Sequence, residues 1–535
     1  GYDVDNVMCN GKFVVKDKKL VQVDEEKIYS DVQKMSNQLV KQLKIEGFAN
    51  PIDSQWGKYK AYYPNKRFNE DSLEDLLKEM VTMKIAVIGG GGVRSPLLAR
   101  SIAFKSKEIG IDEVVFMDNQ KEQLDIYGTI SKIASAKINP NLRFELTTSI
   151  EEAVKDANYI ITTIRVGNDE MRIKDERTAL AHGVIGQETT GAAGISFAMR
   201  SVTVLARYCE IIKKLSQPNV KVFNFTNPAG IVTQTLRDMG YDFCYGICDA
   251  PTSLIESVIR IGGYDKDRLS FECIGLNHFS FITSVKYDGQ EVLDEILDSQ
   301  EIHQHSDLKF MDQALMKRKR MLFNEYLYYY LYPNEAYRNI SQSAKIRSEI
   351  IKEINDGMKE ELQQIDITND FERAIKIYSK WYHKREASYM KNETGMAQDK
   401  EPFIFDVFDN TTNGYASIAL NYITAVETKT KKDLVLCTTS PHQQDFSQDE
   451  VIEVSCTIDG NEVKPHQIQI EDDLIREMVR RIKQYEKAAS KALRSHRKSD
   501  FIDCLMLNPL VCSYVVAKDL TDAFFKINKD FYEEQ

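Results

Sequence analysis

Several polar side chains follow short apolar runs in this sequence, where the strands of a parallel sheet would end. The run "YGICDAP" carries Cys248 and Asp249, and "IGLNHFSF" carries Asn277 and His278. A thiolate and an imidazole are common ligands of divalent metal ions. The two lie 278 − 248 = 30 positions apart, which is not a zinc-finger spacing. Two protein ligands would leave a metal open to substrate and water, as Lewis-acid catalysis requires. A small buried cysteine and a core histidine remain the alternative interpretation.

A run of four glycines follows the apolar segment in "KIAVIGGGGVRSP". Glycine lets the backbone approach a pyrophosphate, and the next helix directs its N–H groups at the same anion. The spacing G-x-G-x-x-G is not met. The next apolar run ends in Asp118, 118 − 89 = 29 positions after the first glycine, where an acid can bind ribose hydroxyls and favours NAD over NADP. A tight structural turn and a helix-capping aspartate are the alternatives. The four glycines are Gly89, Gly90, Gly91 and Gly92.

The pattern of apolar residues along the chain predicts alternating strands and helices that could position these side chains. Apolar runs at 84–88, 112–118, 156–164, 220–227 and 245–248 predict strands, and the segments 95–110 and 194–215 predict helices. Such alternation indicates an α/β fold with a Rossmann-type, doubly wound parallel sheet. After about residue 255 the pattern becomes mixed α+β and mostly helical, with amphipathic helices at 473–495 and 513–534. We expect an arrangement like that of lactate dehydrogenase.

The pattern also divides the chain into three parts. Residues 1–82 form an N-terminal extension, with a β pattern around an Asn10–Gly11 turn and an amphipathic helix over 24–44. This extension resembles the C-terminal tail of amidohydrolases, without the metal-binding histidines of that family, so no active site is expected in it. Residues 83–250 are predicted to form the NAD-binding domain. Residues 251–535 are predicted to form the metal- and substrate-binding domain with the helical C-terminus.

Composition narrows the class of protein. The formal net charge is −11, which argues against nucleic acid or an anionic membrane as the main partner. No apolar run reaches the length of about 18 residues that a spanning helix needs, and no secretory signal is evident. The nine cysteines are scattered and odd in number, which indicates a reducing compartment rather than a disulfide framework. We therefore expect a cytoplasmic protein that binds neither nucleic acid nor membrane.

Seven motifs give a more specific indication. In order they are "VIGGGGVRSPLL", "IRVGNDEMRIKDE", "HGVIGQETTGAAG", "NFTNPAGIVT", "GICDAP", "GLNHF" and "NEYLYYYLYP". From Met83 to about Tyr532 the chain resembles glycoside hydrolase family 4, most of all its 6-phospho-β-glucosidases. This family is an exception to two-carboxylate glycoside hydrolysis. The segments "GYASIALNYITAV" and "LNPLVCSYVVAKDLTDAF" resemble the β-type enzymes.

The resemblance implies hydrolysis of phosphorylated disaccharides or glucosides by redox-assisted elimination. NAD⁺ takes a hydride from C3 of the phosphosugar, a base removes the acidified C2 proton, and the bond from C1 to the leaving group breaks. Water then adds and the hydride returns. NAD and a divalent metal, usually Mn²⁺, are the implied cofactors, and a homodimer or homotetramer is the implied assembly.

The resemblance also assigns roles to individual residues. Cys248 and His278 match the metal ligands, and Tyr326 matches the base that acts at C2. Asp249 matches the acid that protonates the leaving group in α-type enzymes, whereas many β-type members have Asn there. Glu188 matches a position linked to the basicity of the tyrosine, in a role that the sequence leaves open. The residues that match substrate contacts are Arg172, Asn227 and, for the phosphate, Arg347.

Three other functions remain as alternatives. The Asp at position 249 favours a 6-phospho-α-glucosidase of the same family. A dehydrogenase of the lactate or malate type would share the NAD fold and release NADH. A non-catalytic NAD-binding protein would need none of the ligand, base and phosphate positions. Without the family, Tyr326 is one residue of an aromatic helix face, Glu188 is a helix-starting acid, and Arg347 lies on a solvated helix face.

Overall fold

The N-terminal part of the chain contains a small antiparallel sheet. The computed structural model describes residues 7–9, 12–16, 19–20, 83–396, 401–411, 414–442 and 445–532. The three short strands are β1 (Val7–Cys9), β2 (Lys12–Lys16) and β3 (Lys19–Leu20), paired in that order. They occur where the sequence predicts a β pattern. The Asn10–Gly11 turn and the helix over 24–44 lie outside the described residues, so the amidohydrolase-like extension stays a prediction.

Six parallel strands build the first half of the large sheet, in the order β6–β5–β4–β7–β8–β9. The first of these strands along the chain, β4, lies in the middle. The chain then continues outward through β5 to β6 and crosses back to β7 on the other side of β4. This is the strand order of a Rossmann sheet, and ligands bind where it reverses, between β4 and β7. The predicted fold class is therefore confirmed. The strands are β4 (Met83–Ile88), β5 (Ile111–Met117), β6 (Arg143–Thr147), β7 (Tyr159–Thr162), β8 (Lys221–Asn224) and β9 (Cys244–Gly246).

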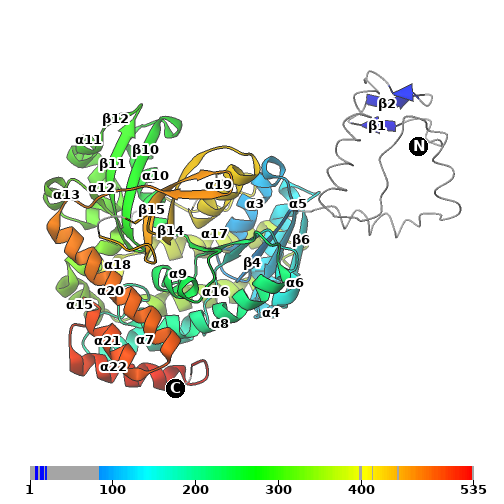
Figure 1. The fold of residues 1–535 in the computed structure, drawn as a ribbon. Helices are drawn as coiled ribbons and strands as arrows, with labels where there is room; N and C mark the ends of the chain where they lie inside the picture. Colours follow the sequence, from blue (N-terminus) through cyan, green and yellow to red (C-terminus); the bar gives the residue numbers. More distant parts are fainter. Residues whose placement is uncertain are drawn as a thin grey trace, which may run out of the picture. The chain divides into compact units, whose positions relative to one another are not determined.

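The sheet does not end at β9, because antiparallel strands from the second half of the chain continue it (Figure 1). Strand β14 pairs with β9 through Cys437 and Gly246, and β15, β10, β11 and β12 follow. The expected mixed α+β region thus shares one 13-stranded sheet with the parallel half, within the described residues. The division at residue 250 stays a prediction. The added strands are β10 (Leu269–Leu276), β11 (Phe279–Tyr287), β12 (Gln290–Glu291), β13 (Leu322–Phe323), β14 (Lys432–Thr439), β15 (Val451–Asp459) and β16 (Glu462–Pro465).

Helices cover both faces of the sheet, and alternate residues of each central strand face opposite cores. Ile85 and Val87 of β4 belong to one apolar cluster with residues of α3, α10 and α19, whereas Ala86 and Ile88 belong to a second cluster with residues of α6, α8, α9, α21 and α22. Helix α20 contributes to both clusters. The helices on the two faces are α3 (Ser95–Ile109), α10 (Ala250–Gly262), α19 (Gly414–Glu427), α6 (Ile150–Val154), α8 (Ala193–Leu215), α9 (Ala229–Asp238), α20 (Asp473–Ser495), α21 (Lys498–Leu507) and α22 (Tyr514–Asn528).

The remaining helices include several that lie beside the carboxyl ends of the parallel strands. Helix α5 packs with α16 and α17 in a third apolar cluster, and α7 contacts α16. Several of these helices carry residues of the site described below, and those after residue 255 fall where the sequence predicts a mostly helical region. The remaining helices are α4 (Lys121–Gln123), α5 (Thr129–Ile138), α7 (Asn168–Ala181), α11 (Leu293–Asp298), α12 (Gln300–His305), α13 (Gln313–Lys319), α14 (Tyr328–Leu331), α15 (Pro333–Gln342), α16 (Arg347–Gln363), α17 (Phe371–Ala387) and α18 (Lys391–Thr394).

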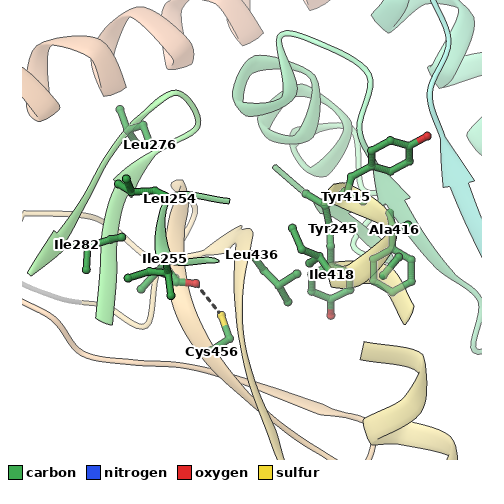
Figure 2. Close-up of a cluster of buried hydrophobic side chains, with 14 of the residues drawn as sticks. Tyr245, Leu254, Ile255, Leu276, Ile282, Tyr415, Ala416, Ile418, Leu436 and Cys456 are labelled. Carbon is green, nitrogen blue, oxygen red and sulfur yellow. Dashed lines mark hydrogen bonds between the residues drawn. The ribbon is translucent and has the colours of Figure 1, made fainter. Parts of the chain in front are cut away.

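The junction between the parallel and antiparallel halves is filled with apolar side chains (Figure 2). Leu436 of β14 lies between a group from α10 and β10, including Leu254 and Leu276, and a group from α19, including Ile418. All four side chains are at most 4% exposed. Burial of each contributes on the order of 2 kcal/mol. The two halves of the chain therefore share one core rather than meeting at a solvated domain interface.

A buried ion pair fixes the C-terminal helix to the parallel half. Arg200 of α8 donates to Asp175 of α7 at 2.6 Å and to Asn528 of α22, also at 2.6 Å. Asn528 in turn donates to Ser196 at 2.7 Å. Because each of these polar groups has a partner, their burial costs less than that of an isolated charge. No helix among the described residues is long and apolar enough to cross a membrane.

Candidate active site

A cavity of about 990 Å³ opens at the point where the strand order reverses. Segments that follow β4, β5, β7, β8 and β9 all line it, as do His278 and residues of α16 and α17. This is the place where open α/β sheets bind ligands. The volume matches that of the larger small-molecule sites. Sequence positions that are more than 200 residues apart therefore meet in one cavity.

The glycine turn lies against the backbone and side chains of neighbouring strands. The N–H groups of Gly89 and Gly90 both donate to the carbonyl of Met117 at 2.8 Å. Gly89 has a φ of +98°, and a Cβ there would lie 2.6 Å from the carbonyl oxygen of Thr163. A Cβ on Gly90 would lie 2.6 Å from the Cβ of Phe116. These close contacts require glycine. Because the turn carries no side chains, its bare backbone faces the cavity directly before α3.

Asp118 holds the turn from the end of β5. Its two carboxylate oxygens accept hydrogen bonds from the N–H groups of Gly91 and Gln120, each at 3.0 Å. Burial raises the pKa of Asp118, while these two hydrogen bonds oppose the shift. The side chain lines the cavity. Asp118 therefore holds the glycine turn in place, and the remaining lone pairs of its carboxylate are available to hydroxyl groups of a ligand.

His278 is held by a two-residue turn and by a directed hydrogen bond. It follows Asn277 in the hairpin between β10 and β11, where Leu276 pairs with Phe279, and its φ is +61°. Its Nδ1 lies 2.8 Å from Oγ1 of Thr189. The Thr189 hydroxyl donates its own proton to Oε1 of Gln187 at 2.8 Å, so in the contact with His278 the hydroxyl oxygen is the acceptor and Nδ1 carries the proton. This tautomer leaves the lone pair on Nε2, as a metal ligand requires.

Burial also favours the neutral form of His278 and of the cysteine. The pKa of His278 is lowered to about 3 by burial. Burial and the carboxylate of Glu453 raise the pKa of Cys248, which therefore becomes a thiolate only if a cation compensates the charge. Among the described residues no group of three or more His, Cys, Asp or Glu side chains could hold a metal. A metal bound by Cys248 and His278 would complete its shell with substrate and water, as the sequence predicts.

Tyr326 lies directly on the ring of His278. The two ring centroids are 3.6 Å apart and the planes differ by 4°. Burial and the carboxylate of Glu325 raise the pKa of Tyr326 above its usual value. Tyr389 donates to Glu325 at 2.8 Å, and all three side chains line the cavity. The phenol can thus remove a proton only if a positive charge nearby stabilises the phenolate.

Glu188 is bound by two arginines. It forms a close ion pair with Arg165 and a second with Arg172 at 3.4 Å. Arg172 also donates to Glu176 at 2.8 Å. Although burial opposes ionisation, the two guanidinium groups outweigh it and lower the pKa of Glu188 to about 2. Glu188 is therefore a carboxylate that orients arginines, and it is not free to accept the proton of Tyr326.

The remaining predicted residues lie around the same cavity. Asp249 precedes α10 and pairs with Arg94 at 3.2 Å. Asn227 follows β8, and Arg347 begins α16, where it donates to Oγ of Ser388 at 2.5 Å. Each of these side chains contributes to the lining.

The structure thus brings twelve of the thirteen predicted residues to the cavity wall, and Gly90 is the exception. Gly90 packs on Phe116 below the wall. Three arginines that the sequence analysis does not include in the site also line the cavity: Arg94, Arg165 and Arg385. The position of Arg94, directly after the glycine turn, is a signal that could have identified it. Arg385 lies inside α17, and its spacing carries no such signal.

The fold and the cavity together place the chain among proteins with a Rossmann-type dinucleotide-binding fold. Comparison with known families is more specific. "Family 4 glycosyl hydrolase" matches residues 84–264, and "Family 4 glycosyl hydrolase C-terminal domain" matches residues 273–511. The chain belongs to family 4 of the glycosyl hydrolases, and its chemistry is that of a glycosidase.

Characterised relatives include enzymes of both anomeric types. The 6-phospho-beta-glucosidase BglT of Thermotoga maritima is 25% identical over 84% of this chain and 99% of its own length. The phospho-alpha-glucosidase PagL of Clostridium acetobutylicum is 27% identical over 85% of this chain and its full length. A structure of the Thermotoga maritima enzyme with manganese, NAD⁺ and glucose-6-phosphate has a TM-score of 0.69, covering 85% of this chain and 100% of that chain.

Proposed function

We propose that this protein hydrolyses 6-phospho-β-glucosides with NAD and a divalent metal as cofactors, and that the metal is Mn²⁺. The observation that carries the proposal is the single cavity, which joins the glycine turn and Asp118 to Cys248, His278, Tyr326 and a set of arginines. A relative with the same fold binds manganese, NAD⁺ and glucose-6-phosphate together. The substrate class is a phosphorylated disaccharide or glucoside.

The residues present fit both cofactors. The backbone of Gly89–Gly92 has no room for a Cβ at three of its four positions, because neighbouring atoms would lie within 2.9 Å. Such a bare turn before α3 suits a pyrophosphate, and Asp118 would bind the ribose. The lone pair on Nε2 of His278 and the thiol of Cys248 suit a borderline-soft divalent metal. When bound, NAD supplies oxidation and reduction at the sugar, and the metal supplies Lewis-acid polarisation.

The side chains of this protein then divide the remaining work. Tyr326 removes the proton from C2 of the sugar, and the stacked His278 ring fixes the direction of its phenol. Glu188 keeps Arg165 and Arg172 in place for polar contacts with the substrate. Asn227 contributes an amide to the same wall, and Arg347 binds the phosphate.

A 6-phospho-α-glucosidase is the second candidate, and Asp249 favours it. This carboxyl group lines the cavity, where a protonated form could donate to a leaving group. Asp249 is engaged in an ion pair with Arg94 at 3.2 Å, which opposes a role at the leaving group. The resemblance of the C-terminal segments to β-type enzymes supports the β preference.

A substrate panel tests the proposal. The p-nitrophenyl α- and β-glucoside 6-phosphates and their unphosphorylated forms are assayed with and without NAD⁺ and Mn²⁺. We expect nitrophenol only from the β-linked phosphorylated form and only with both cofactors. Release from the α-linked form alone would assign the second candidate. Activity on plain glucosides, or NADH accumulation at 340 nm with a 2-hydroxy acid as in a lactate- or malate-type dehydrogenase, would refute both.

The localisation and the oligomeric state of the enzyme are part of the same proposal. A cytoplasmic enzyme fits a substrate that enters metabolism as a sugar phosphate, and we propose a homodimer or homotetramer on the resemblance to the family. Light scattering of the purified protein measures the assembly directly, and a monomeric mass would contradict it.

A further inference from the structure

Three arginines from distant parts of the chain meet at one wall of the cavity. Arg94 directly precedes α3, Arg347 is the first residue of α16, and Arg385 lies in the last turn of α17. Arg347 is tied to the backbone of the third arginine, because its Nη2 donates to the carbonyl of Arg385 at 3.5 Å. Burial and the positive charges of Arg94 and Arg347 lower the pKa of Arg385 to about 10.

The positive charge of this group is only partly compensated. Arg94 pairs with Asp249 at 3.2 Å. Over the described ranges, neither Arg347 nor Arg385 has a carboxylate within ion-pair distance; their partners are neutral. Arg347 donates to Oγ of Ser388 at 2.5 Å, and Arg385 donates to Oδ1 of Asn355 at 3.3 Å. Two half-buried guanidinium groups without counter-ions, facing a cavity, indicate that an anion completes the charge balance.

The position of the pair distinguishes between two phosphate sources. The guanidinium group of Arg347 lies 5.6 Å from the ring centre of Tyr389, whose hydroxyl donates to Glu325, the residue before Tyr326. The pair thus borders the part of the cavity where the sugar reacts in the proposed function. A phosphate monoester carries nearly two negative charges at pH 7, which matches two guanidinium groups. Each phosphate of a dinucleotide carries only one.

We propose that Arg385 is a substrate-binding residue that, with Arg347, holds the phosphate dianion of the sugar between two guanidinium groups. The inference rests on the proposed function and adds a residue to it. A two-arginine clamp makes binding depend on the phosphate monoester as such, because a neutral hydroxymethyl group would leave both charges buried and unpaired.

The test compares Arg385→Met with the parent enzyme and with Arg373→Met. Arg373 is exposed on the same helix and outside the cavity, so it controls for the loss of an arginine from α17. Calorimetry measures the Kd of glucose 6-phosphate and, separately, of NAD⁺. We expect Arg385→Met to weaken glucose 6-phosphate about 10- to 100-fold, the range for one charged hydrogen-bonding group, and to leave NAD⁺ within about twofold. Arg373→Met should match the parent for both.

Other outcomes overturn the proposal. An unchanged Kd for glucose 6-phosphate in Arg385→Met removes Arg385 from the substrate site, and a weakened Kd for NAD⁺ alone assigns it to the pyrophosphate. If Arg385→Met does not fold, Arg385→Lys keeps the charge and should still weaken glucose 6-phosphate about tenfold, because an ammonium group lacks the planar fork. Parent-like affinity in a folded Arg385→Lys would then refute the clamp. A parent that neither binds glucose 6-phosphate nor cleaves phosphoglucosides instead refutes the proposed function itself.

Discussion

The ion pairs of Glu188 lead to a prediction whose size follows from the structure. The guanidinium groups of Arg165 and Arg172 lower the pKa of Glu188 from 4.5 to about 2. A shift of this size contributes about 3 kcal/mol to stability when the carboxylate is ionised. The side chain is 14% exposed, so solvent screening removes little of it. Replacing Glu188 by Gln should lower the free energy of unfolding by about 3 kcal/mol at pH 7, within the range for breaking buried ion pairs.

The pH dependence of the same difference is specific. Because the folded-state pKa is depressed, the stabilisation is fully present above pH 4.5 and is lost as the pH falls toward 2. The difference between the parent and Glu188→Gln should therefore shrink to about 1.4 kcal/mol at pH 3. Urea unfolding followed by circular dichroism at pH 7, 5 and 3 measures it, since urea does not screen charges as guanidinium does.

A surface pair provides the matched control for this experiment. Glu170 forms an ion pair with Lys352 at 3.1 Å, and its side chain is 57% exposed. Exposed pairs contribute only about 0–1 kcal/mol, so Glu170→Gln should stay within that range at every pH. A loss below 1 kcal/mol for Glu188→Gln at pH 7, or a difference that grows as the pH falls, would refute the assignment of Glu188 as an ionised, arginine-orienting group.

Three further changes test the glycine turn, the metal ligand and a buried carboxyl group. Gly89→Ala should weaken NAD⁺ binding at least about tenfold by calorimetry, because its Cβ would meet the carbonyl of Thr163. Gly110 also has a positive φ but has open space around it, so Gly110→Ala should lose stability and keep its NAD⁺ affinity. Cys248→Ser should keep its circular dichroism spectrum and lose bound Mn²⁺ in metal analysis, and parent-like metal content would exclude this ligand. Burial raises the pKa of Glu453 to about 7, so the free energy of unfolding of the parent should fall by about 3 kcal/mol between pH 4.5 and 7. Glu453→Gln should lack this loss and should be more thermally stable than the parent at pH 8. An equal dependence of stability on pH in both proteins would contradict the raised pKa.

The parallel half of the fold could be predicted from the sequence because its signals are local. Gly89, directly after the first apolar run, and Asp118, after β5, stand 118 − 89 = 29 positions apart, and each depends on its own strand. The antiparallel extension could not be predicted in the same way. Strand β10 pairs with β15 through Ile274 and Val454, which are 454 − 274 = 180 positions apart. No local pattern specifies which strands pair over such a distance.

The candidate site shows the same limit. Cys248 and His278 follow strands β9 and β10, so their sequence positions indicated an edge of the sheet, and the family motifs indicated that they act together. Arg385 enters the cavity from α17, and only the packing of α16 and α17 brings it beside Arg347. The role of Glu188 was open for a related reason, since it depends on Arg165, in the turn after β7, and on Arg172, in α7.

Hydrogen exchange at the sugar tests the central claim most directly. The parent enzyme, supplied with NAD⁺ and Mn²⁺, hydrolyses p-nitrophenyl β-glucoside 6-phosphate in D₂O, and the glucose 6-phosphate formed is analysed by NMR before it can isomerise. If Tyr326 removes the C2 proton before the leaving group departs, the product carries deuterium at C2 and no NADH accumulates. A product that keeps its original hydrogen at C2 would contradict elimination and, with it, the role given to this site.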